Sequence, residues 1–555
     1  MFFRGPRAHL AILIALCALS LFAALGSTPL WEPDEPRFAA ATRQMVRTGD
    51  YVDPVFNARP RWEKPILLYW LQAVPLAIGL DDELAMRLPA AVLGTVAVLC
   101  LYTLGAIWCT PTAGLIAAAL LATTFRFVTY ARQGLTDVPA IAGIVATFLA
   151  FEIGSSPERW RRARLAWWTG WILVGLTALI KGPLAVIAPV LWIAATWIRR
   201  REALRWPAIA AGVLVAAVIG GSWFAYMTGK RGSAFVGVNN YEFLQRYFDQ
   251  SFPGPSRGPF FYLAILPGEV APWTLLIAAT LFSLLRARKS LDRRTLDGVV
   301  VSLVWFAGVM LICSVSHYKL PHYALPAYPP LMLLAGIGID RATRDEASGR
   351  IVIASVAITA LIFAAAGAAA VLGALRVPDS LRVGTFSTGV VLVLGAAAAF
   401  AILRRRQGLA PLSLTAAMAL AYGLAAVSIL PALANAAYPY PALGTLVAEK
   451  SSPSVALGSI GTHTALVYYA DRPVSFFTTP SEAAEFLRSS EPRLMVMSRI
   501  EFDAVSQHVA ATELASRRRQ TPRLSRLLEG ALMNAGTEEL LVGNQAAVAL
   551  YAHGN

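Results

Sequence analysis

The sequence carries little charge for its length. Of its 555 residues, 15% are Asp, Glu, Lys or Arg, whereas 57% are hydrophobic. Soluble domains carry about 25% charged residues, so this composition excludes a soluble globular protein. Apolar stretches repeatedly exceed the roughly 17–25 residues that cross a bilayer as a helix. The chain is therefore expected to be a polytopic membrane protein.

Cysteine and histidine are also scarce. The four cysteines all fall within or beside apolar stretches, which excludes a disulfide framework and a cysteine-based zinc site. The six histidines show no metal-ligand spacing. The residues alone therefore assign no cofactor.

The apolar stretches predict about 13 transmembrane helices in a mainly α-helical domain over residues 1–432. The stretch 66–80 is short and follows Pro65, so it is expected to be an interfacial or re-entrant helix. Two long loops, 29–87 and 228–261, interrupt the domain on one side of the membrane. The candidate spans are 8–28, 88–108, 113–131, 137–153, 166–181, 182–199, 207–227, 262–284, 298–315, 323–340, 350–374, 383–403 and 411–432.

The formal net charge of +15 follows from the placement of arginine. Every second loop is arginine-rich, which is the bias of cytoplasmic loops. The charge therefore indicates topology and not a nucleic-acid partner. It predicts a cytoplasmic N-terminus, and, with an odd number of spans, a periplasmic C-terminal region. An alternative for residues 1–26 is a cleavable signal peptide, because a basic start precedes their apolar core.

Residues 433–555 have a mixed composition and are long enough for a small separate domain. Alternating and apolar patterns predict an α/β module outside the membrane. It contains no motif that indicates chemistry. The expected strands are 455–459, 466–470, 474–477 and 494–497, and the expected helices are 481–488 and 501–518.

Two acidic segments lie where the chain leaves the predicted spans on the outside. The sequence Trp-Glu-Pro-Asp-Glu-Pro-Arg at 31–37 follows the first span, and Thr-Asp-Val-Pro at 136–139 begins the fourth. Asp34, Glu35 and Asp137 are functional candidates, because ionisable groups near spans are rare and mostly functional. The alternative is that each carboxylate only caps a helix and faces its dipole.

Isolated cations in the outside loops form a second set of candidates. Lys319 lies in a short connection between two spans, where the positive-inside bias disfavours lysine, so phosphate is its expected partner. Arg246 lies in the second long loop. For the adjacent Glu63 and Lys64, the alternative is that both side chains only extend their charged ends to the membrane interface. Together these groups predict a site where a lipid phosphate leaves and a carboxylate orients or deprotonates an acceptor.

Four segments, taken in order, resemble one known family. They are Trp-Glu-Pro-Asp-Glu-Pro-Arg, Trp-Glu-Lys-Pro at 62–65 with Tyr69-Trp70, Thr-Asp-Val-Pro, and Lys319-Leu320-Pro321 with Tyr323 and Leu325-Pro326. The set resembles the ArnT-type membrane glycosyltransferases. These are the 4-amino-4-deoxy-L-arabinose lipid A transferases and their relatives in the GT-C, protein-mannosyltransferase-like superfamily. About 13 spans and an outside C-terminal domain also fit that family.

The resemblance implies a role for each motif residue. Asp34 and Asp137 match two acids of the family, and we include Glu35 with them as a catalytic candidate. Glu63 matches a glutamate that can join a metal ion near the donor phosphate, so a divalent metal is the one cofactor candidate. The groups expected near the phosphate of an undecaprenyl-phosphate-linked sugar are Lys64, Arg246, Lys319 and Tyr323.

The second long loop departs from the family pattern. The family often has histidine in this loop, whereas this chain has Phe243 in one such segment and Ser256 before a Pro-aromatic run. These differences weaken the metal assignment and leave the identity of the sugar open.

The expected function is that of a bacterial inner-membrane glycosyltransferase with a periplasmic active site. It would move a sugar, with 4-amino-4-deoxy-L-arabinose as the candidate, from undecaprenyl phosphate to lipid A or another periplasmic acceptor, with inversion. One alternative is a protein O-mannosyltransferase-like enzyme. The other is a polyprenyl-lipid flippase or transporter, which should instead place charged residues at helix centres.

Overall fold

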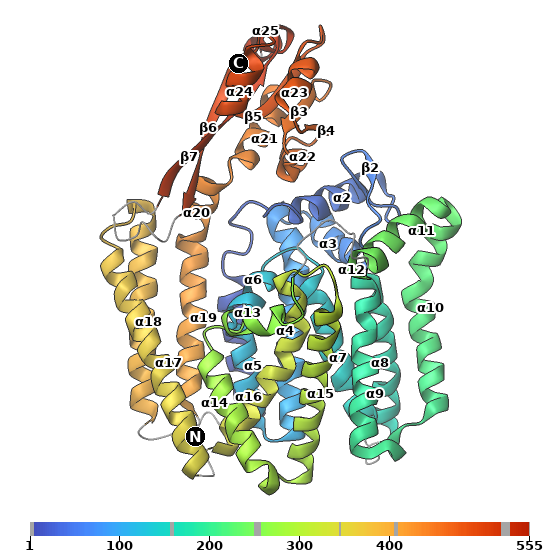
Figure 1. Cartoon of the computed structure of the whole chain (residues 1–555), viewed down its shortest axis with the longest axis vertical. Helices are drawn as coiled ribbons and strands as arrows, with labels where there is room; N and C mark the ends of the chain where they lie inside the picture. Colours follow the sequence, from blue (N-terminus) through green and yellow to red (C-terminus); the bar gives the residue numbers. More distant parts are fainter. Residues whose placement is uncertain are drawn as a thin grey trace.

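The computed structural model describes residues 5–155, 160–248, 257–342, 346–403, 409–522 and 533–553. A body of roughly parallel and antiparallel helices carries a small α/β domain at one end, and the N-terminus lies at the opposite end (Figure 1). We call the end of the body that carries the α/β domain the domain face. This arrangement confirms a mainly α-helical membrane fold with a C-terminal β-sheet region.

Long apolar helices dominate the body. Within the described residues, eight helices are long and apolar enough to cross a membrane, or up to ten if each of two bent pairs counts as one span. The exact number of about 13 stays a prediction. The helices of the body are α1 (Pro6–Cys17, continued by the π-helical η1, Ala18–Phe22), α4 (Asp82–Trp108), α5 (Pro111–Thr123), α6 (Phe125–Ala131), α7 (Asp137–Gly154), α8 (Trp160–Lys181), α9 (Ile187–Arg200), α10 (Trp206–Arg231), α13 (Phe261–Glu269), α14 (Thr274–Ala287), α15 (Arg293–Val315), α16 (Tyr328–Ala342), α17 (Glu346–Gly373), α18 (Asp379–Leu403) and α19 (Ala410–Ser428).

Two of the predicted straight spans are bent helix pairs. The segment 113–131 forms α5 and α6, which meet at 66°, and 262–284 forms α13 and α14, which meet at 113°. Thr124 has an extended backbone that ends α5, and Pro272 in the second break has no N–H with which to continue a helix. Hydrophobicity records which residues avoid water and does not record where the backbone turns, so the sequence pattern missed both bends.

Helices α8 and α9 run in opposite directions. Lys181 at the end of α8 contacts Asp137 at the start of α7, whereas Arg199 at the end of α9 contacts Glu152 near the end of α7. The chain reverses at Gly182, whose φ of +57° strongly favours glycine. This turn brings the end of α8 to the domain face.

The loop between α1 and α4 folds into short elements that cover the domain face. Helix α2 (Glu35–Thr48) begins directly after Asp34. The small hairpin β1 (Val55–Phe56) and β2 (Arg59–Pro60) follows, and then the short apolar helix α3 (Leu67–Ala77). Figure 1 shows α2 and α3 between the helical body and the C-terminal domain.

The turn after α8, the second outside loop and the connection before α16 complete the domain face. They consist of short turns that keep polar side chains near the ends of the long helices. Their elements are η3 (Gly182–Val186), α11 (Ser233–Asn240), η5 (Tyr241–Gln245), α12 (Arg246–Phe248) and η7 (Pro321–Ala327).

The C-terminal domain contains a five-stranded mixed sheet in the order β4-β3-β5-β7-β6. Strand β3 pairs in parallel with β4 and β5, and β7 pairs antiparallel with β5 and β6. The domain boundary near residue 432 stays a prediction. The elements are α20 (Leu430–Ala437), α21 (Pro439–Lys450), β3 (Ala456–Ile460), α22 (Thr464–Tyr469), β4 (Val474–Phe477), α23 (Pro480–Leu487), β5 (Arg493–Ser498), α24 (Arg499–Ser506), β6 (Thr512–Pro522), β7 (Met533–Gly543) and α25 (Gln545–His553).

Two expectations for this domain need correction, and one strand was missed. The predicted strand 466–470 lies in helix α22, because a short buried apolar run fits either conformation and its pattern cannot separate them. The predicted helix 501–518 ends at Ser506, and strand β6 begins at Thr512. Strand β7 was not predicted.

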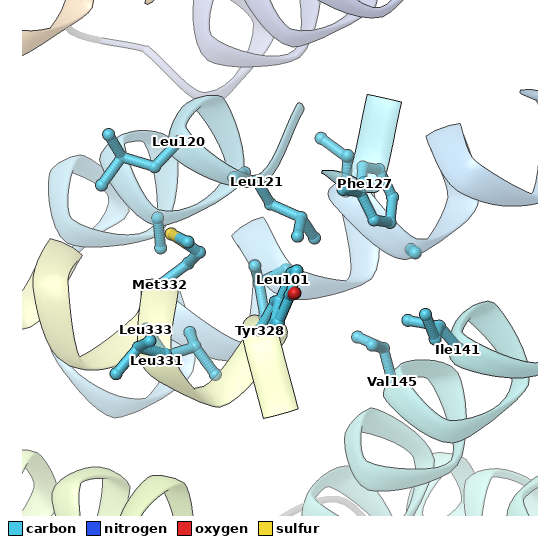
Figure 2. Packing of buried hydrophobic residues seen from close by; sticks show 14 of the residues in the cluster. Leu101, Leu120, Leu121, Phe127, Ile141, Val145, Tyr328, Leu331, Met332 and Leu333 are labelled. Carbon is cyan, nitrogen blue, oxygen red and sulfur yellow. The ribbon is translucent and has the colours of Figure 1, made fainter. Parts of the chain in front are cut away.

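The site rests on a close-packed helical core. Leucine, isoleucine, phenylalanine and tyrosine side chains from α4, α5, α6, α7 and α16 meet below the domain face (Figure 2). Glycine allows α4 and α5 to approach closely, since a Cβ on Gly114 would lie 2.2 Å from the carbonyl oxygen of Tyr102. This packing holds α6 and the start of α7 in fixed positions at the domain face.

Candidate active site

A cavity of about 560 Å³ lies at the domain face. Its walls come from the start of α2, the loop after β2, the segment from the end of α6 to the start of α7, the end of α8, the second outside loop and the segment 318–323 at the start of η7. The cavity therefore joins residues from six parts of the chain. Its lining residues are Pro33, Asp34, Arg37, Phe38, Arg61, Glu63, Lys64, Tyr130, Leu135, Thr136, Asp137, Lys181, Glu242, Arg246, Tyr247, Tyr318, Leu320, His322 and Tyr323.

Asp34 presents a carboxylate to this cavity. It occupies the N-cap position of α2, but its side chain makes no capping hydrogen bond to any described residue. Its ion-pair partner among the described residues is Arg37, at 3.9 Å, and 53% of the Asp34 side chain is exposed. The capping interpretation therefore does not describe Asp34, and its carboxylate is available to a bound molecule.

Asp137 stands at the opposite wall within a charged group. Lys181 Nζ lies 2.6 Å from Asp137 Oδ1, and His322 Nε2 lies 3.9 Å from the same oxygen. The His322 ring also stacks on Tyr130, with ring centres 5.0 Å apart. Burial lowers the pKa of His322, Asp137 opposes that shift and Lys181 adds to it. This wall therefore offers an ammonium, a carboxylate and an imidazole to the same space.

Glu242 holds two cations together on a third wall. Lys64 Nζ donates a hydrogen bond to Glu242, and Arg246 Nη1 lies 2.9 Å from both carboxylate oxygens. The Arg246 guanidinium also lies over the Tyr318 ring, 4.4 Å from its centre. Burial lowers the pKa of Lys64, and Glu242 opposes that shift. Two cations that share one carboxylate can accept a further anion such as phosphate.

An apolar groove of about 550 Å³ adjoins the charged cavity. It runs between α8, α9 and α10 and is lined by residues such as Val174, Ala178, Pro189 and Phe224. The groove and the cavity meet where Gly182 and Phe243 of the groove follow Lys181 and Glu242 of the cavity in sequence. The site thus combines the charged cavity with the adjoining apolar groove.

Comparison with known proteins gives one consistent result. Residues 63–223 match the family model described as dolichyl-phosphate-mannose-protein mannosyltransferase. One relative is undecaprenyl phosphate-alpha-4-amino-4-deoxy-L-arabinose arabinosyl transferase 1 of Pseudomonas fluorescens (strain Pf0-1). The two sequences are 29% identical over 514 residues, which cover 87% of this chain and 84% of the relative. It is 31% identical to the Pseudomonas aeruginosa (strain UCBPP-PA14) transferase of the same description, over 58% of each chain.

The fold agrees with these sequence relatives. The crystal structure of ArnT from Cupriavidus metallidurans bound to undecaprenyl phosphate superimposes with a TM-score of 0.76 at 22% identity, covering 97% of this chain and 98% of that one. The chain resembles the ArnT-type glycosyltransferases in sequence and in fold. The expected resemblance and the GT-C fold are confirmed, whereas the roles of individual residues stay predictions.

Six of the eight predicted site residues of this ArnT-like chain line the cavity. They are Asp34, Asp137, Glu63, Lys64, Arg246 and Tyr323. Sequence reasoning missed other lining groups, notably Lys181, Glu242 and His322. Lys181 ends an apolar run on the outside of the membrane. A lysine at that position is a signal in the sequence that could have identified it as a candidate. Glu242 lies beside Phe243, which departs from the family pattern, and His322 lies beside the predicted Tyr323.

Glu35 does not line the cavity. Its Oε1 accepts hydrogen bonds from Gly134 N (2.6 Å) and Arg87 Nε (3.1 Å). Its Oε2 accepts from Trp31 N (2.7 Å) and Arg87 Nη2 (2.9 Å), and the Glu35 and Arg87 side chains are each 1% exposed. These bonds occupy both oxygens, so the geometry favours an architectural role for Glu35 over the predicted catalytic one.

Lys319 also lies outside the lining of the cavity. It is 3% exposed, and its ammonium donates to the carbonyl oxygen of Ser316 three residues earlier. Burial lowers the pKa of Lys319. Within the described chain, the cations that do line the cavity near Glu242 are Lys64, Arg246 and Lys181, so the geometry does not favour the predicted phosphate contact of Lys319.

The residues present do not fit a resident metal ion. Glu63 Oε2 is buried and has no hydrogen-bond partner among the described residues, which is the one feature that suggests a ligand. However, the described part of the chain holds no group of three His, Cys, Asp or Glu side chains that could bind a metal. The cation-rich surroundings of Glu63 further disfavour one, so no step of the chemistry below uses a metal.

Proposed function

We propose that this ArnT-like enzyme transfers a sugar from undecaprenyl phosphate to lipid A or another acceptor at the outer surface of the bacterial inner membrane. The observation that carries the proposal is the meeting of a cationic cavity with an apolar groove at Gly182 and Phe243. A polyprenyl phosphate has this same combination of an anionic head and a long apolar tail.

The donor fits this site in two parts. Its phosphate would lie against Lys64 and Arg246, competing with Glu242 for their hydrogen bonds. Its tail would enter the groove between α8 and α10, where burial contributes about 25 cal/mol for each Å² of apolar surface. The similarity to the undecaprenyl phosphate-dependent relatives and to the solved ArnT complex with undecaprenyl phosphate supports an undecaprenyl phosphate donor. They also support 4-amino-4-deoxy-L-arabinose as the candidate sugar.

The proposed reaction is a direct displacement at the anomeric carbon. An acceptor oxygen forms the new bond from the face opposite the phosphate, and the old C–O bond breaks with its electron pair going to the phosphate oxygen. The configuration therefore inverts. Lys64 and Arg246 stabilise the charge that develops on the phosphate. Asp34 orients the acceptor oxygen and takes its proton if the acceptor is a hydroxyl.

The proposed orientation places the cavity in the periplasm. Arg199, Arg200, Arg293 and Arg294 lie at the helix ends away from the domain face, as shown by the contacts of Arg199 with Glu152 and of Arg294 with the last turn of α4. Arginine-rich ends are typical of the cytoplasmic side. The domain face and the C-terminal domain would then be outside.

A second candidate function is a protein O-mannosyltransferase. The match of residues 63–223 to the dolichyl-phosphate-mannose-protein mannosyltransferase model favours it. The two functions share the donor class, and they differ in whether a lipid or a polypeptide supplies the acceptor oxygen. A transporter without chemistry is disfavoured, because the charged groups of the cavity lie at helix ends on one face and not at helix centres.

The test is to incubate the purified protein in nanodiscs with undecaprenyl-phosphate-linked aminoarabinose or a polyprenyl-phosphate-linked hexose, and with lipid A or a serine- and threonine-rich peptide. Mass spectrometry of both acceptors identifies the product. We expect lipid A to gain one aminoarabinose, and Asp34→Asn to serve as the inactive control. A mannosylated peptide with unchanged lipid A would contradict the proposal and favour the second candidate.

A further inference from the structure

The C-terminal domain touches the residues that immediately precede Asp34. Thr464 Oγ1 donates a hydrogen bond to the carbonyl oxygen of Pro33 at 2.9 Å, and the N–H of Ala465 donates to Glu32 Oε1 at 2.7 Å. Thr464 is fully buried, and the Glu32 side chain is 16% exposed. The first turn of α22 therefore forms hydrogen bonds with both the backbone and a side chain of this loop.

Tyr469 and Tyr438 add further contacts between the C-terminal region and this loop. Tyr469 OH accepts a hydrogen bond from the N–H of Leu30 at 2.9 Å and donates one to Glu83 Oε1 at 2.7 Å. The Tyr438 ring packs edge-on against Trp31, with ring centres 5.0 Å apart. Each of the four residues before Asp34 is thus in contact with a residue of the C-terminal region.

Asp34 depends on these neighbours for its position. Among the described residues, its own side chain has one ion-pair partner, Arg37, at the long distance of 3.9 Å. The next residue in the chain, Glu35, accepts hydrogen bonds from Arg87 and Gly134 of the helical body. Asp34 therefore stands between two carboxylates with different anchors, one bound to the C-terminal domain and one bound to the body.

The sheet topology explains why α22 reaches this loop. Strand β3 lies between its parallel neighbours β4 and β5, and α22 leaves from its carboxyl end. Open α/β sheets bind their ligands at this edge, where the strand order reverses. In Figure 1, α22 extends from the sheet toward α2. The edge that binds small molecules in other α/β domains is directed here toward the loop that carries Asp34.

We propose that the C-terminal domain is a positioning element for the active site and that Glu32 is its main point of contact. Glu32 holds the loop 31–33 against α22 and so sets the direction in which Asp34 enters the cavity. The inference rests on the proposed function only in taking Asp34 as the group that meets the acceptor. Glu32 itself is a positioning residue, since it is not among the residues that line the cavity.

The test compares variants of this contact in the full-length protein. Glu32→Ala removes the acceptor for the Ala465 N–H, whereas Glu32→Gln keeps an oxygen in its place. A displacement near 1 Å at a reacting group costs roughly 100-fold in rate, so Glu32→Ala is expected to lower kcat by roughly 10- to 100-fold. Donor affinity should stay within about twofold of wild type, because Lys64 and Arg246 lie on other segments. Glu32→Gln should recover most of the rate.

Arg47→Ala is the matched control in the same interface. Arg47 Nη1 pairs with Asp471 at 2.7 Å, but it lies at the other end of α2, roughly 20 Å from Asp34 at 1.5 Å per residue. It is expected to keep kcat within about twofold. Thr464→Val, which removes only the bond to Pro33, should lower kcat without changing donor affinity and replaces Glu32→Ala if that variant does not fold.

Two results would overturn the proposal. One is wild-type kcat in folded Glu32→Ala or Thr464→Val. The other is an equal loss of kcat in Arg47→Ala, which would mean that the interface only stabilises the fold. A wild-type protein that transfers no sugar at all would instead contradict the proposed function, so the two failures are distinguishable.

Discussion

Lys181 and Asp137 form an ion pair across the ends of two neighbouring helices, with Nζ 2.6 Å from Oδ1. Their side chains are 19% and 10% exposed, so the pair lies mostly out of water within the wall of the cavity. Removing one partner leaves the other as an uncompensated charge, whereas removing both does not. The pair therefore fixes the end of α8 to the start of α7 and keeps both charges beside the donor site.

The first prediction is a double-mutant cycle on this pair. Asp137→Asn and Lys181→Met should each lower the free energy of unfolding, and the double variant should lose less than the sum of the two. The expected coupling is about 0.5–3 kcal/mol, as for partly buried contacts. Thermal and denaturant unfolding in a fixed detergent measure it. Strictly additive losses would show that the two groups do not support each other.

The second prediction contrasts two adjacent carboxylates. Asp34→Asn should abolish transfer with little change in unfolding temperature, because its side chain faces the cavity and makes no capping bond to the described residues. Glu35→Gln should instead destabilise the fold by about 3–5 kcal/mol, because it leaves the buried Arg87 without its counter-charge. Activity normalised to the folded fraction separates the two effects. A stable but inactive Glu35→Gln protein would restore Glu35 as a catalytic candidate.

The motif at 31–37 shows how far the sequence could predict the site. Its density of acids at a membrane edge identified the region, and its order with the other motifs identified the family. It could not show that Glu32 and Glu35 have different partners, because those partners come from the distant residues 465 and 87. Only the fold brings these positions together. The distribution of roles within a motif is therefore a property of long-range packing.

Lys319 and Lys181 show the same limit for cations. Lys319 stood out in sequence because it was alone in a short outside loop, yet a carbonyl group three residues away accepts its hydrogen bond. Lys181 ends an apolar run, so the pattern predicts only the end of a span there. In the structure it lies in the cavity wall beside Asp137. Hydropathy predicted the helices well because it is local. Which helix ends converge depends on packing and on bends such as the 113° turn before α14.

The third prediction concerns the donor phosphate. Lys64→Ala should weaken binding of undecaprenyl phosphate by about 10- to 150-fold, which corresponds to the loss of one charge-assisted hydrogen bond of about 1.5–3 kcal/mol. Lys319→Ala should change donor affinity by less than threefold, since Lys319 lies outside the cavity lining and its ammonium donates to Ser316. Binding is measured by titrating each folded variant with undecaprenyl phosphate in nanodiscs.

Arg246→Lys adds a control for the chemistry of the phosphate site. It keeps the charge but loses the planar guanidinium, whose Nη1 now contacts both oxygens of Glu242, so an intermediate loss of affinity is expected. A larger effect of Lys319→Ala than of Lys64→Ala would reverse the assignment and return Lys319 to the donor site.

The fourth prediction is a pH dependence of stability that originates at His322. Burial lowers its pKa below the ordinary value of 6.5, Asp137 opposes this shift, and Lys181 and Arg126 add to it. As the pH falls through 6.5, the unfolded chain binds a proton at this position while the native protein still holds a neutral ring. The unfolded state then binds more protons, so the free energy of unfolding should fall as the pH falls below about 6.5.

His322→Gln should make this decline shallower, because glutamine does not titrate and can still reach Asp137. Unfolding temperatures of the wild type and the variant between pH 5 and pH 8 measure the difference, which should be largest at the acid end. His508→Gln is the matched control, since His508 is exposed on the C-terminal domain and its loss should leave the wild-type profile unchanged. An identical acid decline in His322→Gln would show that other groups titrate on unfolding and that the native His322 ring is not kept neutral by its surroundings.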